Sequence, residues 1–127
     1  MCNIESASGG KLRVVVVDDD QAVRESLKFA LELEGLIVKT HASGQALLDD
    51  ALSADCLVLD YKMPAMDGLA VLAALFARGS HIPAILITAP VTAKVRDAAG
   101  RAGVFSVLEK PLADNVLLQN IRCATRS

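Results

Sequence analysis

The sequence of 127 residues lacks the features that mark several classes of protein. It has three cysteines, an odd number whose spacing matches neither a disulfide framework nor a metal site. Its two histidines, His41 and His81, have no acid or cysteine at metal-ligand spacing in the sequence. No apolar run is long enough for a transmembrane helix or the core of a signal peptide. We therefore expect a cytoplasmic protein without a zinc site, a disulfide or a membrane segment.

Positive charge is also scarce, since 13 Lys and Arg residues face 15 Asp and Glu residues, for a net charge of −2. Binding to nucleic acid phosphates needs a basic face, so we expect no direct nucleic acid binding by this chain. The length and the 53% share of apolar residues fit one compact domain. Residues 1–11 hold Ser, Gly and Asn without periodicity, which predicts a disordered tail, and residues 12–127 are expected to form the domain.

Strand and helix patterns alternate five times along this domain. Short apolar runs predict buried strands, and each is followed by apolar residues at helical spacing. We expect strands at 14–17, 36–40, 56–59, 82–88 and 104–109, and helices at 21–34, 43–52, 69–77, 92–102 and 113–125. Such alternation requires right-handed crossovers and a parallel sheet with helices on both faces. Three aspartates replace the glycine-rich turn of a dinucleotide-binding fold, so we predict an α/β, flavodoxin-like (βα)5 domain with strand order 2-1-3-4-5.

Polar side chains with complementary chemistry end four of these strands. Asp18 and Asp19 follow the first strand and Asp60 follows the third, which this strand order places side by side. Carboxylates about 5 Å apart repel by roughly 3 kcal/mol at an effective dielectric of about 20, so a cation is expected among them. Oxygen ligands suit Mg²⁺, or Mn²⁺ in its place, better than zinc. With Thr88 and Lys110 at the same edge, the sequence offers the groups needed for phosphoryl transfer to an aspartate.

Four motifs, taken together in order and spacing, carry a resemblance to a known family. They are Val-Asp-Asp at 17–19, Asp-x-x-Met-Pro-x-Met-Asp-Gly at 60–68, Ile-Thr-Ala at 87–89 and Glu-Lys-Pro at 109–111. The segment from Leu12 to about Thr125 resembles the receiver domains of two-component response regulators, particularly those that precede helix-turn-helix output domains.

The resemblance implies a role for each residue at the sheet edge. Asp60 would be the phosphoacceptor, Thr88 the switch hydroxyl and Lys110 a contact of the phosphate. Ala89 and Lys62 would lie beside the phosphate, and the peptide bond between Lys110 and Pro111 would be cis. Mg²⁺ would be held by three carboxylates and one backbone carbonyl, those of Asp18, Asp19, Asp60 and Lys62.

The function implied by the resemblance is a phosphorylation-dependent switch and not a classical enzyme. A sensor histidine kinase or phosphotransfer protein would phosphorylate Asp60. Phosphorylation would change the surface of the fourth helix, fifth strand and fifth helix, which could also form a homodimer interface, and so control a partner or output domain. Neither Lys62 nor Pro90 offers an acid or amide to orient an attacking water, so we expect self-phosphorylation with slow autodephosphorylation.

The sequence departs from the family pattern at two places near this edge. Val107 stands where the family usually has Tyr or Phe, and Phe105, on the same strand face by alternation, is the candidate substitute for that ring. Pro90 removes a backbone donor and stiffens the loop that follows Thr88 and Ala89.

Two other functions remain open on the sequence. One is a receiver fold used as a binding module that does not depend on phosphorylation. The other is a phosphatase of the haloacid dehalogenase type, with Asp18 as the nucleophile and Asp20 as the general acid. That scheme leaves Asp60 without a role, and it wants a pair of metal-binding acids after Lys110, where only Asp114 follows.

Overall fold

The computed structural model describes residues 11–50, 53–113 and 115–126, in which five strands and five helices alternate. The strands are β1 (Arg13–Val17), β2 (Ile37–His41), β3 (Cys56–Asp60), β4 (Ala84–Thr88) and β5 (Ser106–Glu109). The helices are α1 (Gln21–Leu33), α2 (Gly44–Leu48), α3 (Gly68–Ala77), α4 (Ala93–Arg101) and α5 (Val116–Thr125). Most of the predicted tail, residues 1–10, lies outside the described residues, as does Asp114.

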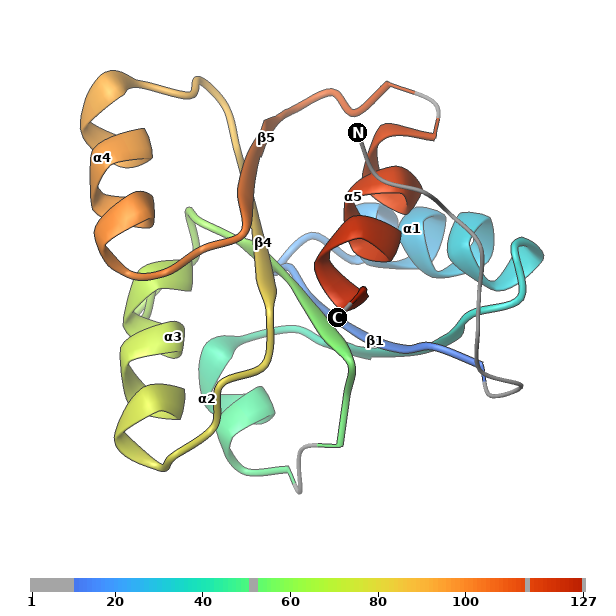
Figure 1. The fold of residues 1–127 in the computed structure, drawn as a ribbon, viewed down its shortest axis with the longest axis horizontal. Coiled ribbons are helices and arrows are strands. Elements are labelled where there is room, and N and C mark those ends of the chain that lie inside the picture. The colour runs from blue at the N-terminus through green and yellow to red at the C-terminus, as the bar shows by residue number, and fades with distance from the viewer. Residues whose placement is uncertain (1–10, 51–52, 114, 127) are drawn as a thin grey trace.

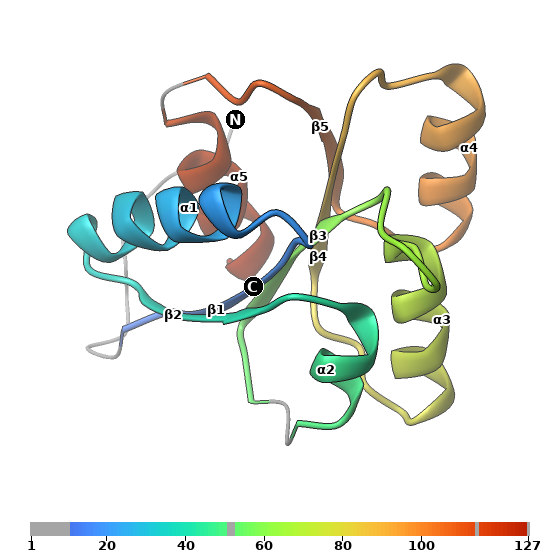
Figure 2. The ribbon, with the colours of Figure 1, turned by 180° about the vertical axis from the view of Figure 1, so that it is seen from behind.

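The five strands form one parallel sheet in the order β2-β1-β3-β4-β5, which confirms the predicted topology (Figures 1 and 2). β1 and β3 are neighbours although a strand and two helices separate them in the sequence. Their register pairs Val17 with Leu59, so the residues that follow, Asp18 and Asp60, meet at one edge. Because every strand runs the same way, that edge collects the carboxyl ends of all five.

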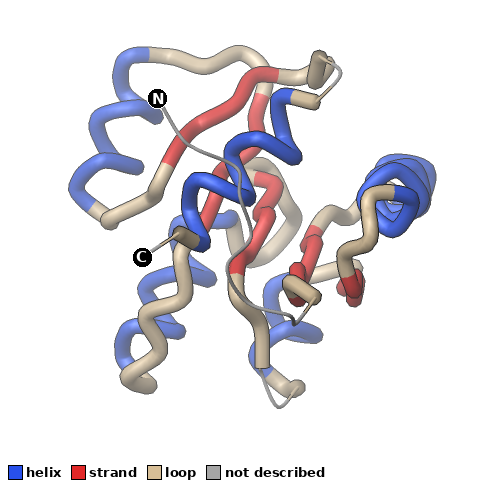
Figure 3. Tube along the Cα trace, turned by 45° about the vertical axis from the view of Figure 1, so that its right-hand side comes forward, coloured by secondary structure: helices blue, strands red, loops and turns tan. Residues whose placement is uncertain are grey.

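The helices cover both faces of the sheet, and the strands lie between them in Figure 3. α1 and α5 lie side by side over one face, while α2, α3 and α4 cover the other (Figures 1 and 2). Alternation within β1 divides its valines between the two cores, with Val14 and Val16 on the α1 and α5 side and Val15 and Val17 opposite. Each such fully buried side chain contributes about 1.5–3 kcal/mol.

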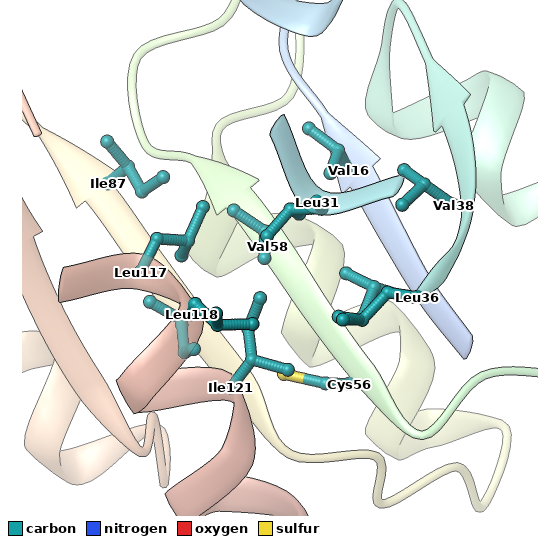
Figure 4. Close-up of a cluster of buried hydrophobic side chains, with 12 residues drawn as sticks. Val16, Leu31, Leu36, Val38, Cys56, Val58, Ile87, Leu117, Leu118 and Ile121 are labelled. Atoms are coloured by element: carbon teal, nitrogen blue, oxygen red, sulfur yellow. The ribbon is translucent and has the colours of Figure 1, made fainter. Parts of the chain in front are cut away.

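Figure 4 shows the core under α1 and α5, where Leu117, Leu118 and Ile121 of α5 lie over β3 and β4. Cys56 belongs to this core, and burial, together with the neighbouring Asp55 carboxylate, raises the pKa of its thiol to about 12. A thiol so far from ionisation is an unreactive part of the packing.

Several element ends differ from the prediction. α2 ends at Leu48, short of the predicted end at residue 52, and residues 51–52 lie outside the described residues. α5 begins at Val116 instead of residue 113, because Asn115 at its N-cap takes a left-handed φ of 69°. β5 begins two residues late, since the Val104 amide still donates to the Ala99 carbonyl of α4.

β4 also begins two residues late, at Ala84, directly after Pro83, which has no N–H to donate. The predicted cis bond between Lys110 and Pro111 is confirmed, and the Ala89–Pro90 bond is cis as well. No helix in the described part of the chain combines the length and apolar composition that a membrane span requires.

Candidate functional site

Three carboxylates meet where β1 and β3 end. Asp18, Asp19 and Asp60 each place one oxygen within 4.8 Å of the others, which confirms that these acids converge. Asp18 and Asp60 are buried, whereas Asp19 is exposed. The site is therefore open to solvent on the Asp19 side and closed by the sheet beneath Asp60.

Hydrogen bonds to β2 and within the loop between β1 and α1 hold Asp18. Its amide donates to the His41 carbonyl at 3.2 Å, and its Oδ1 accepts from the Asp20 amide at 2.9 Å. Asp20 is the N-cap of α1, where its Oδ1 accepts from the amides of Ala22 and Val23. In the sequence Asp-Asp-Asp, the first two acids thus line the site and the third is the N-cap of the helix.

Lys110 provides the positive charge at this edge. Its Nζ lies 3.2 Å from Asp18 Oδ2 and 3.3 Å from Asp60 Oδ1, so one ammonium group bridges two buried acids. The Lys110 amide donates to the Thr88 carbonyl at 2.9 Å, which fixes the residue against the end of β4.

The pKa values of Asp60 and Lys110 are both raised. Burial raises the pKa of Asp60, the Asp18 charge raises it further, and Lys110 opposes both. Burial alone would lower the pKa of Lys110, but the charges of Asp18 and Asp60 outweigh it and the net shift is upward. The folded protein therefore favours a positive charge at this edge and resists a third negative one.

The donor set fits a divalent cation. Each pair of carboxylates at this spacing repels by roughly 3 kcal/mol at an effective dielectric of about 20. Lys110 balances one of the three charges of Asp18, Asp19 and Asp60, which leaves two, the charge of one divalent ion. Carboxylate oxygens are the ligands that Mg²⁺ and Mn²⁺ prefer.

Thr88 ends β4 beside Asp60, with 1% of its surface exposed. Its Oγ1 is buried without a hydrogen-bond partner in the described part of the chain. An unsatisfied buried hydroxyl costs free energy, so such groups are rare unless another state of the protein uses them. The next residue, Ala89, is exposed, and its carbonyl accepts from Lys62 Nζ at 2.9 Å.

Gly68 lies close to the backbone of Asp60. Its amide donates to the Tyr61 carbonyl at 3.0 Å, and a Cβ at this position would lie only 2.9 Å from the Asp60 carbonyl oxygen. The Tyr61 amide donates to the Ile87 carbonyl, and its side chain is half-buried against the core on the α2, α3 and α4 side. The glycine of the 60–68 motif therefore lets the chain turn close behind the acid.

Comparison with known proteins places these features in one family, since residues 14–122 match the family model described as the response regulator receiver domain. The chain belongs to the response regulator receiver family. It is 41% identical over 115 residues to the transcriptional regulatory protein FixJ of Azorhizobium caulinodans, covering 89% of this chain and 54% of FixJ. It is 40% identical over 117 residues to the response regulator MprA of Mycobacterium avium (strain 104), covering 91% of this chain and 51% of MprA.

The crystal structure of FixJ-N shares the fold with a TM-score of 0.84 and 34% identity, covering 91% of this chain and 94% of that one. The chain spans about half the length of FixJ and of MprA.

The receiver domain does not use Phe105 as a substitute for the missing ring. Phe105 precedes β5, donates its amide to the Ala84 carbonyl at 2.8 Å, and is 47% exposed. Ala84 lies four residues before Thr88, which is about 13 Å along a strand. The prediction that Phe105 substitutes for the family's aromatic ring is therefore wrong. Val107, which packs against the core on the α4 side, stands at the position of that ring.

Three contacts of the receiver domain were missed from the sequence. Arg24 Nη1 donates to the Asp18 carbonyl at 2.7 Å, Lys62 reaches Ala89, and Glu109 Oε2 accepts from the Val91 amide at 2.9 Å. All three use long side chains whose direction depends on tertiary neighbours. The only sequence signal is the place of Arg24 in the first turns of a helix, where side chains lean back toward the N-terminus.

Each histidine contacts a side chain away from the three acids. His41 has no acid at ligand spacing in the sequence, but its Nε2 lies 3.2 Å from Asp50 Oδ2 in space, without the alignment of a hydrogen bond. The His81 ring lies 5.0 Å from that of Phe76, centroid to centroid. Neither histidine belongs to the described cluster of three acids.

Proposed function

We propose that this receiver domain is a cytoplasmic switch in which Asp60 accepts a phosphoryl group from a sensor histidine kinase or a phosphotransfer protein. One observation carries the proposal: the buried Asp60 carboxylate lies within 4.8 Å of two further carboxylates and 3.3 Å from the Lys110 ammonium group. No structural reason is apparent for placing three acids and a lysine together, and the arrangement suits a reaction that brings in further negative charge.

In the proposed reaction an Asp60 carboxylate oxygen attacks the phosphorus of a phosphohistidine. The bond from Asp60 to phosphorus forms as the phosphorus–nitrogen bond breaks, and the histidine nitrogen leaves with the electron pair. Lys110, already 3.3 Å from Asp60, would neutralise charge on the transferred oxygens. By opposing the rise in pKa that burial causes, Lys110 also favours the ionised carboxylate that the attack requires.

Asp18, Asp19, Asp60 and the Lys62 carbonyl oxygen would hold Mg²⁺, for which Mn²⁺ could substitute. When bound, the ion supplies positive charge to the phosphoryl oxygens in the transition state. The protein's own contribution is to keep the three carboxylates converged.

The unpaired Thr88 hydroxyl supports the switch. It has no partner in the described structure and would donate to an oxygen of the phosphorylated Asp60. Ala89 and Lys62 would lie beside that phosphate. The resulting movement would reach the surface of α4, β5 and α5, where an output domain, a partner or a second copy of the chain would bind. Relatives about twice as long, one of them a transcriptional regulatory protein, support an output domain that controls transcription.

Slow autodephosphorylation is part of the proposal. The Lys62 ammonium group only donates, here to the Ala89 carbonyl, and the Pro90 side chain has no polar group, so neither offers an acid or amide to orient an attacking water. We expect the phosphorylated protein to persist for many minutes in Mg²⁺, measured by loss of the phosphoryl group over time. A half-life of seconds would contradict this.

The test is labelling with acetyl phosphate and Mg²⁺, followed by intact-mass measurement. The wild type is expected to gain one phosphoryl group, and Asp60→Asn none. Asp67→Asn is the matched control, since it removes an acid from the same loop while asparagine keeps the α3 cap that Asp67 makes to the Ala70 amide. Labelling of Asp60→Asn at the wild-type rate would overturn the assignment of Asp60.

A second candidate is a binding module that does not depend on phosphorylation, favoured by Val107 and by the distance of Phe105 from Thr88. It predicts that a labelled protein keeps its surface unchanged. The phosphatase alternative has less support, since Asp60, to which it gives no role, belongs to the cluster of three acids and lies 3.3 Å from Lys110. Turnover of a generic phosphate ester would revive it.

A further inference from the structure

Arg24 contacts the acidic loop from the side of α1. Its amide donates to the Asp20 carbonyl at 3.0 Å, the first hydrogen bond of the helix. Its side chain runs back over the loop, and Nη1 donates to the Asp18 carbonyl oxygen at 2.7 Å. The guanidinium group is charged at all ordinary pH values, so this is a charge-assisted hydrogen bond to the main chain.

The choice of partner is informative. Asp18, Asp19 and Asp20 all lie in the loop beneath Arg24, yet in the described part of the chain its guanidinium group forms no ion pair with a carboxylate. By binding the carbonyl oxygen, Arg24 holds Asp18 without occupying a carboxylate oxygen that a metal ion needs as a ligand. An arginine paired with the acids themselves would compete with the ion.

Arg24 completes the support of Asp18. The amide of Asp18 donates to His41, Oδ1 accepts from the Asp20 amide, and Oδ2 lies 3.2 Å from Lys110. Of these groups, Lys110 also contacts Asp60 and would contact the phosphate, so its contact with Asp18 is free to change during the reaction. The bond from Arg24 ties the carbonyl to a helix that takes no part in the reaction.

We propose that Arg24 is a positioning residue for the divalent cation: it holds the Asp18 carbonyl so that the Asp18 and Asp19 carboxylates stay directed at Asp60. The inference rests on the proposed function, because it presumes that the three acids bind Mg²⁺. Outer contacts of this kind commonly change metal affinity by about 10- to 100-fold when they are lost.

Electrostatics and positioning predict opposite signs for the loss of Arg24. Removing a positive charge close to an acidic cluster would, by Coulomb's law alone, strengthen the binding of a cation. Releasing the loop from α1 would weaken it, because the carboxylates must then be ordered when the ion binds. The direction of the change therefore separates the two roles.

The experiment is calorimetric titration of the unphosphorylated full chain with Mg²⁺. Arg24→Met is expected to bind about tenfold more weakly than the wild type. Arg24→Lys is expected to recover part of the loss, about threefold weaker than the wild type, because a single ammonium group can still reach a carbonyl but lacks the rigid planar fork. At saturating Mg²⁺ the rate of labelling by acetyl phosphate should return close to that of the wild type.

Lys28→Met is the matched control, because it removes one positive charge from α1 at an exposed ion pair with Glu32. It is expected to leave the affinity within about twofold of the wild type. Arg24→Met binding as tightly as the wild type, or more tightly, would overturn the positioning role. If Arg24→Met does not fold, wild-type affinity in Arg24→Lys overturns it instead. A wild type that binds no Mg²⁺ would overturn the proposed metal site itself.

Discussion

Asp60 is the residue at which stability and the proposed function conflict, because burial and the Asp18 charge raise its pKa while the proposed phosphoryl transfer needs it ionised. Lys110 reduces the conflict without removing it, since one ammonium group serves two acids. Active sites often hold such unfavourable arrangements at the expense of folding free energy. The cost should be measurable in the metal-free protein.

Asp60→Asn is therefore expected to stabilise the metal-free protein by about 1 kcal/mol at neutral pH. The raised pKa means that the folded chain holds a proton on Asp60 that the unfolded chain has released above its ordinary pKa of 3.8. The wild type thus loses stability relative to the variant as pH rises from about 3.8 through the raised pKa. Urea unfolding in EDTA at a series of pH values measures the difference.

Asp67→Asn, outside the cluster and still able to cap α3, should show no such pH-dependent gain. An Asp60→Asn variant less stable than the wild type at neutral pH would contradict the account of the buried charge. So would a gap between them that stays constant down to acidic pH.

Gly68→Ala tests how closely the chain must turn behind the acid. Its Cβ would lie 2.9 Å from the Asp60 carbonyl oxygen and 2.7 Å from a Leu86 methyl group, so the backbone at the site must shift. We expect a loss of about 1–3 kcal/mol in the free energy of unfolding and slower labelling by acetyl phosphate. Gly100→Ala, whose Cβ meets nothing within 4 Å, is the control and should be neutral or slightly stabilising. Equal behaviour of the two variants would count against this role for Gly68.

At this scale the sequence identified the acids, Thr88 and Lys110, because each ends an apolar run and strand order brings such ends together. It did not identify the contacts of Arg24 or Glu109. A long side chain has many rotamers, and its choice among them depends on neighbours that only the folded chain supplies.

At the scale of elements, one hydrogen bond from each neighbouring strand's end holds the loop after β4. Lys62, beyond the end of β3, donates to the Ala89 carbonyl, and Glu109, at the end of β5, accepts from the Val91 amide. Residues 89–91 are thus fastened to the two strands that flank β4. A displacement of Thr88 has to break or carry these two hydrogen bonds.

Glu109→Ala should loosen this loop without disturbing the acids. We expect faster hydrogen exchange at the Val91 amide, by about fivefold, since a single hydrogen bond contributes roughly 1 kcal/mol. Lys94→Ala, at an exposed position of α4, is the control and should leave that exchange rate unchanged. An unchanged rate in Glu109→Ala would mean that the loop is held by other contacts.

Element order was predictable because apolar runs and helical spacing alternate, whereas element ends were less so. α1 shows how little of an apolar face can be covered: only Leu31 is buried, while Phe29 and Leu33 are 67% and 69% exposed. Periodicity predicts which residues share a face but not how far the opposing layer extends over it. The late start of α5 depends on the backbone of one residue, Asn115.

In the molecule as a whole, the two edge strands of the sheet, β2 and β5, are covered incompletely. In β5, Ser106, Val107 and Leu108 are only partly buried, while every residue of β3 and β4 is buried. β5 lies at the edge of the sheet next to α4 and ends at Lys110. It therefore joins the site to an incompletely covered part of the protein surface.

Addition of beryllofluoride and Mg²⁺, which together imitate the phosphorylated state, is expected to shift amide resonances on α4, β5 and α5 as well as at the site. Asp60→Asn should show no shifts beyond those caused by Mg²⁺ alone. Shifts confined to the three acids and Thr88 would instead favour the binding module, because the conformational change would then not reach the surface of α4, β5 and α5.

Tyr61 gives the molecule an optical property of its own. The chain has one tyrosine and no tryptophan, and that tyrosine directly follows Asp60, with its side chain half-buried against the core on the α2, α3 and α4 side. Near-ultraviolet signals report the fixed surroundings of aromatic side chains. Emission from this protein therefore comes almost wholly from the residue that follows Asp60 in the chain, and we expect a change in its intensity to report the proposed phosphorylation without a label.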